Sequence, residues 1–355
     1  MPISDKYTFG SKVVFMDRHY SPDWRKMKFP PTETLPSQAN ANSTANDYSA
    51  DAASATPSEK FFIEVDNPDS FSLDKVSQLH HNYHLHPLMQ LDQLEELAKR
   101  LVGKHQCRFI EDEVKLGTPF MLSNDPPPGC TIETIFANIE KQGSWLAIYD
   151  VQTDLLYKRF LWEVIGSAEK LVKGKEKIWD VRGFIFMSAP PAITPFHIDR
   201  ENNFWLQTRG RKKLNLWDRA DRDVVPGYVA EEFILYRSLE RVRLQPAMES
   251  YAKKYDCGPG DGVYFPSTTP HATESETHWT RPGDGVAISI GIVFYTDVTK
   301  RTAYVHAANH VLRRLGLTPM NPGQSIWVDR LKYSIGRIAI TVMKHFRGFK
   351  PPPGF

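Results

Sequence analysis

Cysteine and long apolar runs are scarce in this 355-residue sequence. Its three cysteines, Cys107, Cys130 and Cys257, lie far apart and form no Cys-x-x-Cys pair. We therefore expect neither a disulfide framework nor a thiolate zinc site, and this usage fits a reducing compartment. No run of 18 or more apolar residues occurs, and the first residues, MPISDKYTFG, lack the order of a secretory signal. A cytoplasmic protein without a membrane span is expected.

Acidic residues are rare near the C-terminus. Residues 300–350 contain ten Lys and Arg residues against one acid, Asp329, which gives a local charge of +9. Because the whole chain has 44 basic and 42 acidic residues, the remainder has 34 against 41, a charge of −7. A basic segment therefore follows an acidic body. No zinc-finger spacing or interleaving of aromatic and basic residues accompanies it, so nucleic acid is not the expected partner.

The composition divides the chain into three parts. Residues 33–59 are rich in Ala, Ser, Asn, Asp and Thr, which is typical of a flexible linker. We expect residues 1–59 to form a tail and disordered linker, residues 60–298 to form the main domain with a helical flank, and residues 299–355 to form a basic helical extension. With 41% hydrophobic residues, the chain can build a substantial core.

Apolar spacing predicts the elements of these parts. Helices are expected over residues 91–102, 157–172, 299–315 and 325–346, and a strand at FFIEV, residues 61–65. From residue 177, short β-rich runs such as IWDVRGFIFMS, KKLNLW and GVAISIGIVFY follow one another, separated by Gly, Pro, Asp and Arg clusters. Many short strands without intervening helices predict an antiparallel sandwich or barrel.

Residues 194–217, TPFHIDRENNFWLQTRGRKKLNLW, carry the candidate chemistry. Since positions i and i+2 share one face of a strand, His197 and Asp199 can lie side by side. Two histidines and one carboxylate form the site of non-haem Fe(II) oxygenases, which keeps open positions. His271 and His278 are candidates for the missing ligand. His271 is favoured because it follows the strand-like DGVYF and a Pro-bounded turn, whereas His278 lies in an acid-rich loop.

The residues of this segment resemble a known pattern. They read TPxHxDxxxNFxxQxxGxK from Thr194 to Lys212. This resembles the JmjC-type, cupin-like Fe(II)/2-oxoglutarate-dependent oxygenases and is similar to the asparaginyl hydroxylase acting on hypoxia-inducible factor. The likeness spans about residues 140–296, and HPLMQLDQLEELAKRL and GSWLAIYD also resemble bacterial cupin-like proteins. It implies a mainly β fold with flanking helices around a double-stranded β-helix, or jelly-roll, core.

The resemblance also implies cofactors and their ligands. His197, Asp199 and His271 would hold Fe(II). Lys212 would pair with the distal carboxylate of 2-oxoglutarate, and Thr194 would add a hydroxyl to it. Molecular oxygen would be the oxidant.

Further pocket residues follow from the same resemblance. Asn203 would lie near the metal-proximal end of the co-substrate and Gln207 toward the substrate. Trp145 and Tyr149 could supply an aromatic wall and a phenol hydroxyl, although aromatic residues in apolar strands more often belong to the core.

A cation at the far end of the pocket has a physical reason, because an unpaired buried carboxylate is costly. Lys212 opens an apolar strand and could reach inward. The competing interpretation is that Lys212 lies in a solvated turn, because its neighbours Arg209, Arg211 and Lys213 are also charged. Arg281, ten residues after His271, is the alternative anchor.

The sequence differs from the asparaginyl hydroxylase at two positions that bear on the substrate. The run AISIGIVF places Gly291 and Val293 where the asparaginyl hydroxylase has Asn and Trp, so the substrate stays open. The expected activity is that of a dioxygenase, most simply a hydroxylase, which couples decarboxylation of 2-oxoglutarate to C–H oxidation of a small molecule or a protein side chain. The alternative is a non-catalytic cupin-like binding or regulatory module.

Two other clusters have simple interpretations. The final helix combines a basic stripe, Arg330, Arg337 and Lys344, with apolar residues at helical spacing. Such a helix can bind anionic membranes or nucleic acid, but it more commonly packs on its own domain or on a second subunit. We expect a homodimer through the C-terminal helices. The four histidines of HHNYHLHP, residues 80–87, are expected in a polar loop rather than a metal site.

Overall fold

A computed structural model describes residues 61–109, 123, 125–141, 144–172, 176–275 and 285–355, and every structural statement below concerns these. All of these described residues belong to one compact unit of the chain, residues 46–355. The tail and linker expected over residues 1–59 lie outside the described part. The expected strand at residues 61–65 is shorter, because only Ile63–Glu64 pairs with a neighbour.

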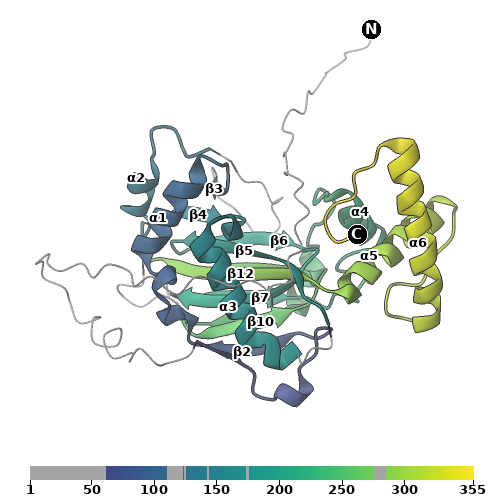
Figure 1. Ribbon diagram of the computed structural model, residues 1–355, viewed down its shortest axis with the longest axis horizontal. Helices are drawn as coiled ribbons and strands as arrows, with labels where there is room; N and C mark the ends of the chain where they lie inside the picture. The colour runs from purple at the N-terminus through teal and green to yellow at the C-terminus, as the bar shows by residue number, and fades with distance from the viewer. Residues whose placement is uncertain (1–60, 110–122, 124, 142–143, 173–175, 276–284) are drawn as a thin grey trace, which may run out of the picture. The chain divides into compact units, whose positions relative to one another are not determined.

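Two antiparallel sheets form the body (Figure 1). The larger has the order β1-β2-β10-β7-β12-β5-β4-β3 and the smaller the order β6-β11-β8-β9. The strands are β1 (Ile63–Glu64), β2 (Ser77–His81), β3 (Cys107–Phe109), β4 (Trp145–Ile148), β5 (Trp179–Ser188), β6 (Ala192–His197), β7 (Asn202–Arg209), β8 (Lys212–Leu216), β9 (Lys253–Cys257), β10 (Asp261–Phe265), β11 (His271–Ser275) and β12 (Ala287–Tyr295).

The strand order identifies the fold class. From β5 to β12 the chain alternates between the sheets except at β8 and β9, which are neighbours in the smaller sheet; this gives β10-β7-β12-β5 on one side and β6-β11-β8-β9 on the other. Eight antiparallel strands in two such sheets form a jelly roll, the architecture of cupins. The predicted double-stranded β-helix core is therefore confirmed.

Helices flank this core. They are α1 (Leu91–Val102), α2 (Ile132–Phe136), α3 (Leu155–Val172), α4 (Gly227–Tyr236), α5 (Asp297–Arg314) and α6 (Ile326–Arg347), and short 3-10 turns span Pro68–Ser70, Tyr83–Leu85, Pro87–Met89, Val151–Thr153 and Pro246–Tyr251. The four helices predicted from periodicity occur within two residues of the expected ends. The sequence did not predict α4. Among the described residues, no helix has both the length and the apolar character needed to cross a bilayer.

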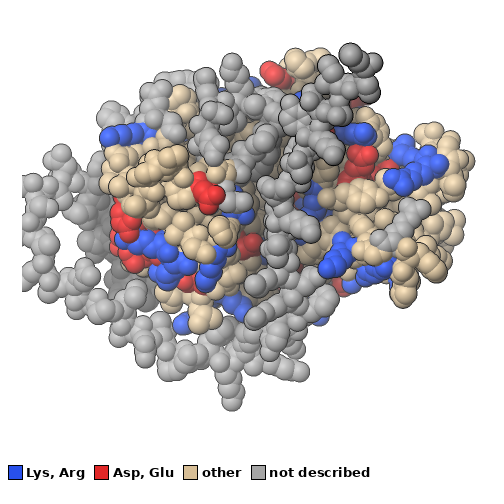
Figure 2. Space-filling view, turned by 90° about the horizontal axis from the view of Figure 1, so that it is seen from above, with Lys and Arg blue, Asp and Glu red and all other residues tan. Residues whose placement is uncertain are grey.

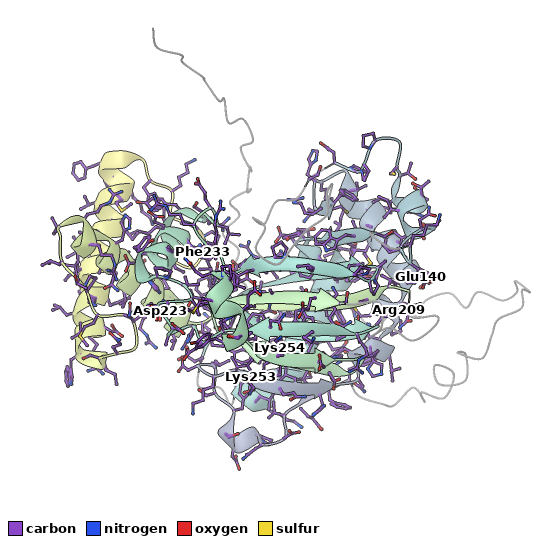
Figure 3. All side chains as sticks on the ribbon, turned by 180° about the vertical axis from the view of Figure 1, so that it is seen from behind. Glu140, Arg209, Asp223, Phe233, Lys253 and Lys254 are labelled. Carbon is purple, nitrogen blue, oxygen red and sulfur yellow. The ribbon has the colours of Figure 1, made fainter. Side chains whose placement is uncertain are left out.

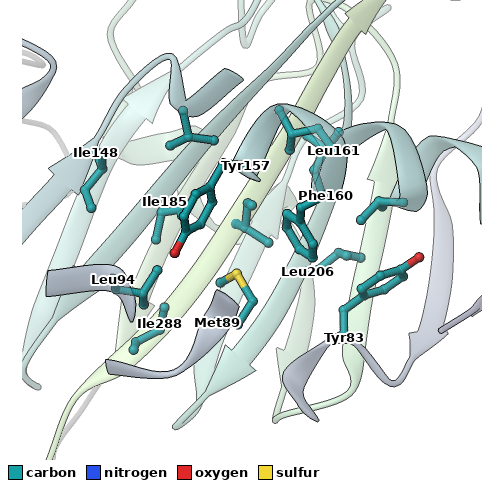
Figure 4. Packing of buried hydrophobic residues seen from close by; sticks show 14 of the residues in the cluster. Tyr83, Met89, Leu94, Ile148, Tyr157, Phe160, Leu161, Ile185, Leu206 and Ile288 are labelled. Atoms are coloured by element: carbon teal, nitrogen blue, oxygen red, sulfur yellow. The ribbon is translucent and has the colours of Figure 1, made fainter. Parts of the chain in front are cut away.

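The outer face of the larger sheet is the main hydrophobic core. Alternate residues of its strands, such as Ile185, Leu206 and Ile288, pack against α1 and α3 (Figure 4). Phe160 and Leu94 reach this layer from the two helices. Because the neighbouring residues of each strand point the other way, this packing fixes which side chains face the interior between the sheets.

The histidine cluster at residues 80–87 differs from the expected polar loop. His80 and His81 end β2, and His81 and His86 are buried. His81 Nε2 lies 3.0 Å from the Asp261 carbonyl oxygen, and its Nδ1 accepts from the Tyr83 N–H. Burial lowers the pKa of both buried imidazoles to about 4. These two rings are therefore neutral packing groups, and the polar-loop prediction is wrong for them.

The C-terminal helices form their own packed layer. Helix α5 packs against α4 and α6, and a small cluster of Leu235, Ala307 and Ile340 joins the three. Gly336 makes the α5–α6 approach possible, since a Cβ at this position would collide with the Tyr304 carbonyl oxygen. One face of α6 is thereby buried against α5.

Candidate metal centre

Three predicted ligand residues meet at one end of the jelly roll. His197 ends β6, Asp199 follows two residues later, and His271 begins β11, where the strand register pairs it with His197. One ligand atom from each residue lies within 4.8 Å of those of the other two. The two imidazole centroids are 4.0 Å apart, and His271 Nε2 lies 3.5 Å from Asp199 Oδ2. The three side chains therefore form a compact His-Asp-His group.

Backbone carbonyls orient both imidazoles. His197 Nδ1 lies 2.7 Å from the Pro195 carbonyl oxygen, and His271 Nδ1 lies 2.9 Å from that of Thr269. Since a carbonyl only accepts, each Nδ1 must carry the hydrogen, which leaves the Nε2 lone pair for a metal ion. Burial and the nearby His197 lower the pKa of His271 well below 6.5. His271 is therefore neutral and ready to coordinate at physiological pH.

Two loops hold the group together. The Thr268 N–H donates to the Asp199 carbonyl oxygen at 2.8 Å, and the Ser267 N–H donates to Asn202 Oδ1 at 3.0 Å. Thr268 has φ = 62°, a left-handed conformation that β-branched residues rarely adopt. Its bond to the Asp199 backbone therefore supports an unusual turn next to the candidate ligands. Asp199 itself keeps 32% of its side chain exposed, so the group is open on that side.

Lys212 lies on the inner face of the smaller sheet. It shares this face with Leu214 and Leu216, which pack inside the barrel against Trp205 and Phe265. The register pairs Leu216 with His271, so Lys212 begins four residues, or roughly 13 Å, along the strand from the histidine. The competing interpretation of a solvated turn is wrong, because only 3% of Lys212 is exposed.

The Lys212 ammonium has no hydrogen bond or ion pair within the described part of the chain. Burial lowers its pKa from 10.5 to about 7. Neighbouring charges are engaged elsewhere: Arg209 reaches Glu140 at 3.0 Å (Figure 3), and Lys213 lies 3.9 Å from Glu274. Because a buried cation without a counter-ion is costly, the position calls for an anion.

Other buried polar atoms share the interior. Five buried atoms on inward-facing strand positions have no hydrogen-bond partner among the described residues: Trp145 Nε1, Asn203 Oδ1, Gln207 Oε1, Ser275 Oγ and Ser289 Oγ. Each such atom costs about 1–3 kcal/mol while it is unpaired. Together with the buried Lys212, these five atoms give the interior of the jelly roll unused donors and acceptors. Thr194, buried and paired with Thr273 on the same face, adds a hydroxyl.

Aromatic side chains line the β4–β5 side of the pocket. The Tyr149 ring lies 5.0 Å from Phe184 and 6.1 Å from Phe186, and the Trp145 ring lies 6.4 Å from Phe186. Burial and the charge of Asp199 raise the pKa of Tyr149, so its phenol is protonated and electrostatically coupled to the His-Asp-His group. The two predicted aromatic residues thus lie on the interior side of their strand.

The alternative ligand and anchor and the two positions on β12 complete the predicted set. His278 and Arg281 lie outside the described residues. A Cβ added to Gly291 would lie 3.2 Å from the Asn203 amide, so the absent side chain leaves room for Asn203. Val293 pairs with Asn203 across the β7–β12 ladder and is fully buried.

Sequence reasoning missed a second carboxylate near the ligands. The Tyr295 hydroxyl donates to Glu201 Oε1 at 2.5 Å, and both burial and the charge of Asp199 raise the pKa of Glu201. Buried Arg200 stands beside them, with its guanidinium 5.4 Å from the Phe355 ring. The only signal was that Glu201 repeats the two-residue step from His197 to Asp199.

No protein-family model and no curated protein matches this chain. A crystal structure of the ribosomal oxygenase YcfD of Escherichia coli matches with 12% identity and a TM-score of 0.42, covering 82% of this chain and 70% of that one. The same protein in complex with cobalt and 2-oxoglutarate matches with 14% identity and a TM-score of 0.39, covering 82% and 70%. Such values do not assign a function, which must come from the site itself.

Proposed function

We propose that the protein is an Fe(II)- and 2-oxoglutarate-dependent dioxygenase, most simply a hydroxylase. The observation that carries the proposal is the meeting of His197, Asp199 and His271 at the end of a jelly roll whose interior buries Lys212 without a counter-ion among the described residues. A metal site alone needs no buried lysine, and a buried lysine alone needs no metal site. A chelating dicarboxylate accounts for both.

The donor set fits ferrous iron. Two imidazole nitrogens and one carboxylate oxygen suit non-haem Fe(II) and leave coordination positions for other ligands. The keto-acid end of 2-oxoglutarate would bind there, and its distal carboxylate would meet Lys212 and Thr194. The unpaired interior atoms of Ser275 and Ser289 add polar partners that an apolar ligand would leave unsatisfied.

The protein's own residues then have defined tasks. His197, Asp199 and His271 hold the metal, and the Pro195 and Thr269 carbonyls keep both imidazoles in the coordinating tautomer. When bound, iron and 2-oxoglutarate supply oxidative decarboxylation coupled to oxidation of a C–H bond by molecular oxygen.

The remaining pocket residues orient the co-substrate. Lys212 fixes the distal carboxylate, Asn203 lies near the metal-proximal end of the co-substrate, and Gln207 lies toward the substrate. The aromatic wall of Trp145 and Tyr149 limits water around the co-substrate.

The substrate is a small molecule or a protein side chain. Gly291 and Val293 replace the polar and aromatic residues of the asparaginyl hydroxylase, so a different substrate is expected. The second candidate, a non-catalytic binding module, needs neither the three ligands nor the buried lysine together. We also propose a cytoplasmic location, which agrees with the three free thiols at Cys107, Cys130 and Cys257.

An anaerobic titration tests the proposal without knowledge of the substrate. Adding Fe(II) and then 2-oxoglutarate to the purified protein should produce the visible metal-to-ligand charge-transfer band of a chelated keto acid. Succinate, which lacks the keto group, is the matched control and should give no band. Iron binding without a band would contradict the dioxygenase and favour the non-catalytic module.

We further propose a homodimer through the C-terminal helices. The face of α6 opposite to α5 exposes a stripe of apolar side chains, between 47% and 83% of each: Trp327, Leu331, Ile338, Val342 and Phe346. Lysines and arginines share the surface of these helices with uncharged residues (Figure 2). A contiguous apolar stripe of this kind marks an association surface.

Charge placed in this stripe should separate the subunits. The Leu331→Asp/Ile338→Asp variant is expected to be monomeric, because two carboxylates per subunit would have to be buried in the interface. Size-exclusion chromatography with light scattering measures the mass. Lys344→Asp, at an exposed basic position of α6 outside the stripe, is the control and should remain dimeric. A wild-type protein that is monomeric at all concentrations would rule out the homodimer.

A further inference from the structure

A second cavity lies beside the loops that carry the candidate ligands. Its volume is about 260 Å³, and its walls come from residues 68–74, the end of α3 with Glu176, and the start of α5. Asn202 and Ser267 complete it. None of the inward-facing residues of the jelly roll described above lines it. The cavity is therefore a site distinct from the polar pocket that holds Lys212.

The cavity wall combines apolar side chains with an excess of negative charge. Apolar side chains, among them Phe71, Leu73 and Leu171, line it together with three carboxylates, Asp69, Asp74 and Glu176, and one cation, Arg219. The formal charge of the lining is therefore −2. Apolar walls with an excess of carboxylates fit an organic cation that has an aliphatic stem.

The carboxylates can reach a ligand. Asp74 and Arg219 form an exposed pair at 3.3 Å, with 65% and 34% of their side chains accessible. Glu176 accepts from the Val298 N–H at 3.2 Å through Oε2, while its Oε1 lies 3.8 Å from Arg301, which is exposed. The Asp74–Arg219 pair is solvent-exposed and contributes little, so an incoming cation can replace Arg219 there. The long 3.8 Å contact of Glu176 with the exposed Arg301 leaves Oε1 without a hydrogen bond to it.

The size of the cavity sets the class of ligand. At about 260 Å³ it is below the 300–1,000 Å³ typical of pockets for whole cofactors or drug-sized molecules. One long side chain fits the space better. Lysine and arginine are the side chains that combine an aliphatic stem with a positive charge.

Two lining residues of the cavity, Asn202 and Ser267, lie close in the chain to the candidate ligands Asp199 and His271. Asn202 lies three residues after Asp199, so their Cα atoms are at most roughly 11 Å apart. Asn202 also binds the Ser267 N–H and thereby joins the Asp199 loop to the loop before His271. An extended polypeptide that occupied the cavity could present a residue three or four positions away to the metal centre.

We propose that this cavity holds a lysine or arginine side chain of a polypeptide substrate whose reacting residue lies at the metal centre. The proposal rests on the proposed dioxygenase function and deepens it by naming the substrate class. The acidic lining selects the basic residue, and the short distance to Asp199 sets the spacing between that residue and the site of oxidation.

The first test measures binding without iron. NMR titration with N-acetyl-arginine methylamide should show saturable binding, and the neutral isostere N-acetyl-citrulline methylamide should bind about tenfold more weakly. The Asp74→Asn/Glu176→Gln variant should lose this preference; glutamine keeps a carbonyl oxygen for the Val298 N–H. Arg219→Ala should bind the arginine probe more tightly, because it removes the competing cation.

Matched controls separate charge from structure. Asp92→Asn/Glu96→Gln neutralises two exposed carboxylates of α1 outside the cavity and should leave the preference for arginine unchanged. Thr302→Trp fills the cavity without changing its charge and should abolish binding of both probes. Equal binding of arginine and citrulline probes by the wild type, or weaker binding by Arg219→Ala, would overturn the proposal.

The second test uses turnover. Peptide libraries with one position fixed as arginine should stimulate iron-dependent succinate formation more than libraries with citrulline there, and the Asp74→Asn/Glu176→Gln variant should lose the difference. Stimulation that ignores the fixed residue would overturn the basic-residue assignment. The wild-type charge-transfer band keeps the two proposals apart: a missing band contradicts the dioxygenase, whereas a band together with indifferent probes contradicts only this cavity.

Discussion

The Asp199→Ala variant should lose all measurable conversion of 2-oxoglutarate to succinate while it keeps its fold. Asp199 supplies the only carboxylate of the His-Asp-His group. Even partners that merely orient a ligand cost 10–100-fold in metal affinity when they are removed, so loss of the ligand itself should weaken Fe(II) binding by at least about 100-fold. The backbone bond from Thr268 to Asp199 survives the substitution.

The Asp199→Ala substitution should not destabilise the fold. Burial raises the pKa of Asp199, which means that its ionised form is disfavoured without a metal ion. Removing this charge should leave the melting temperature of the metal-free protein unchanged or higher. Fe(II) affinity, succinate formation and thermal unfolding together measure the effect.

A carboxylate on the same strand as His271 provides the control. Glu274 lies on β11 but on the opposite face, where it accepts from the Asn215 amide at 3.1 Å. Glu274→Gln should keep both Fe(II) binding and succinate formation. Succinate formation by Asp199→Ala at the wild-type rate would remove Asp199 from the site and with it the proposed metal centre.

Local sequence patterns anticipated the parts of this site that lie close together in the chain. The two-residue step from His197 to Asp199 and the strand-turn-strand pattern before His271 were both readable from the sequence. Their meeting depends on the pairing of β6 with β11, a contact over more than 70 residues that periodicity cannot specify. The resemblance to a family supplied that long-range information.

Other features had no local signal. Ser289 is a small residue within an apolar strand and Ser275 ends the polar run HATES, so only the inward face of the assembled jelly roll makes their hydroxyls functional candidates. The Glu201–Tyr295 contact joins residues 94 positions apart. Helix α4 is buried against both the smaller sheet and α5, so its apolar residues cover two faces and show little helical periodicity. Contacts of this kind exist only after the chain has folded.

Replacing Lys212 by methionine should raise the 2-oxoglutarate concentration needed for half-maximal succinate formation by roughly 100-fold or more. Methionine keeps the volume and removes the charge, so the distal carboxylate would be buried without a partner. Breaking a buried ion pair in this way costs about 3–5 kcal/mol, which corresponds to more than two orders of magnitude in affinity. Arg281→Ala is the comparison, and a larger effect of that variant would reassign the anchor.

The same substitution should stabilise the protein when 2-oxoglutarate is absent. Burial lowers the pKa of Lys212 in the folded state to about 7, against 10.5 for an ordinary lysine. Between these two values the unfolded chain holds a proton that the folded chain has released, so wild-type stability should rise with pH across this window, by roughly 5 kcal/mol at most. Below pH 7 both states are protonated and the full penalty applies.

Lys212→Met has no such group, so its stability advantage should be largest at and below pH 7 and should fade toward pH 10.5. Urea unfolding of the metal-free protein at pH 6.5 and 9.5 measures this advantage.

Binding of the dicarboxylate should raise the pKa of Lys212 again, because an ammonium paired with a carboxylate keeps its proton. At pH 8 the binding of 2-oxoglutarate should then take up close to one proton in the wild type and none in Lys212→Met, which calorimetry in buffers of different ionisation enthalpy detects. Equal proton uptake by both proteins would show that the carboxylate binds away from Lys212.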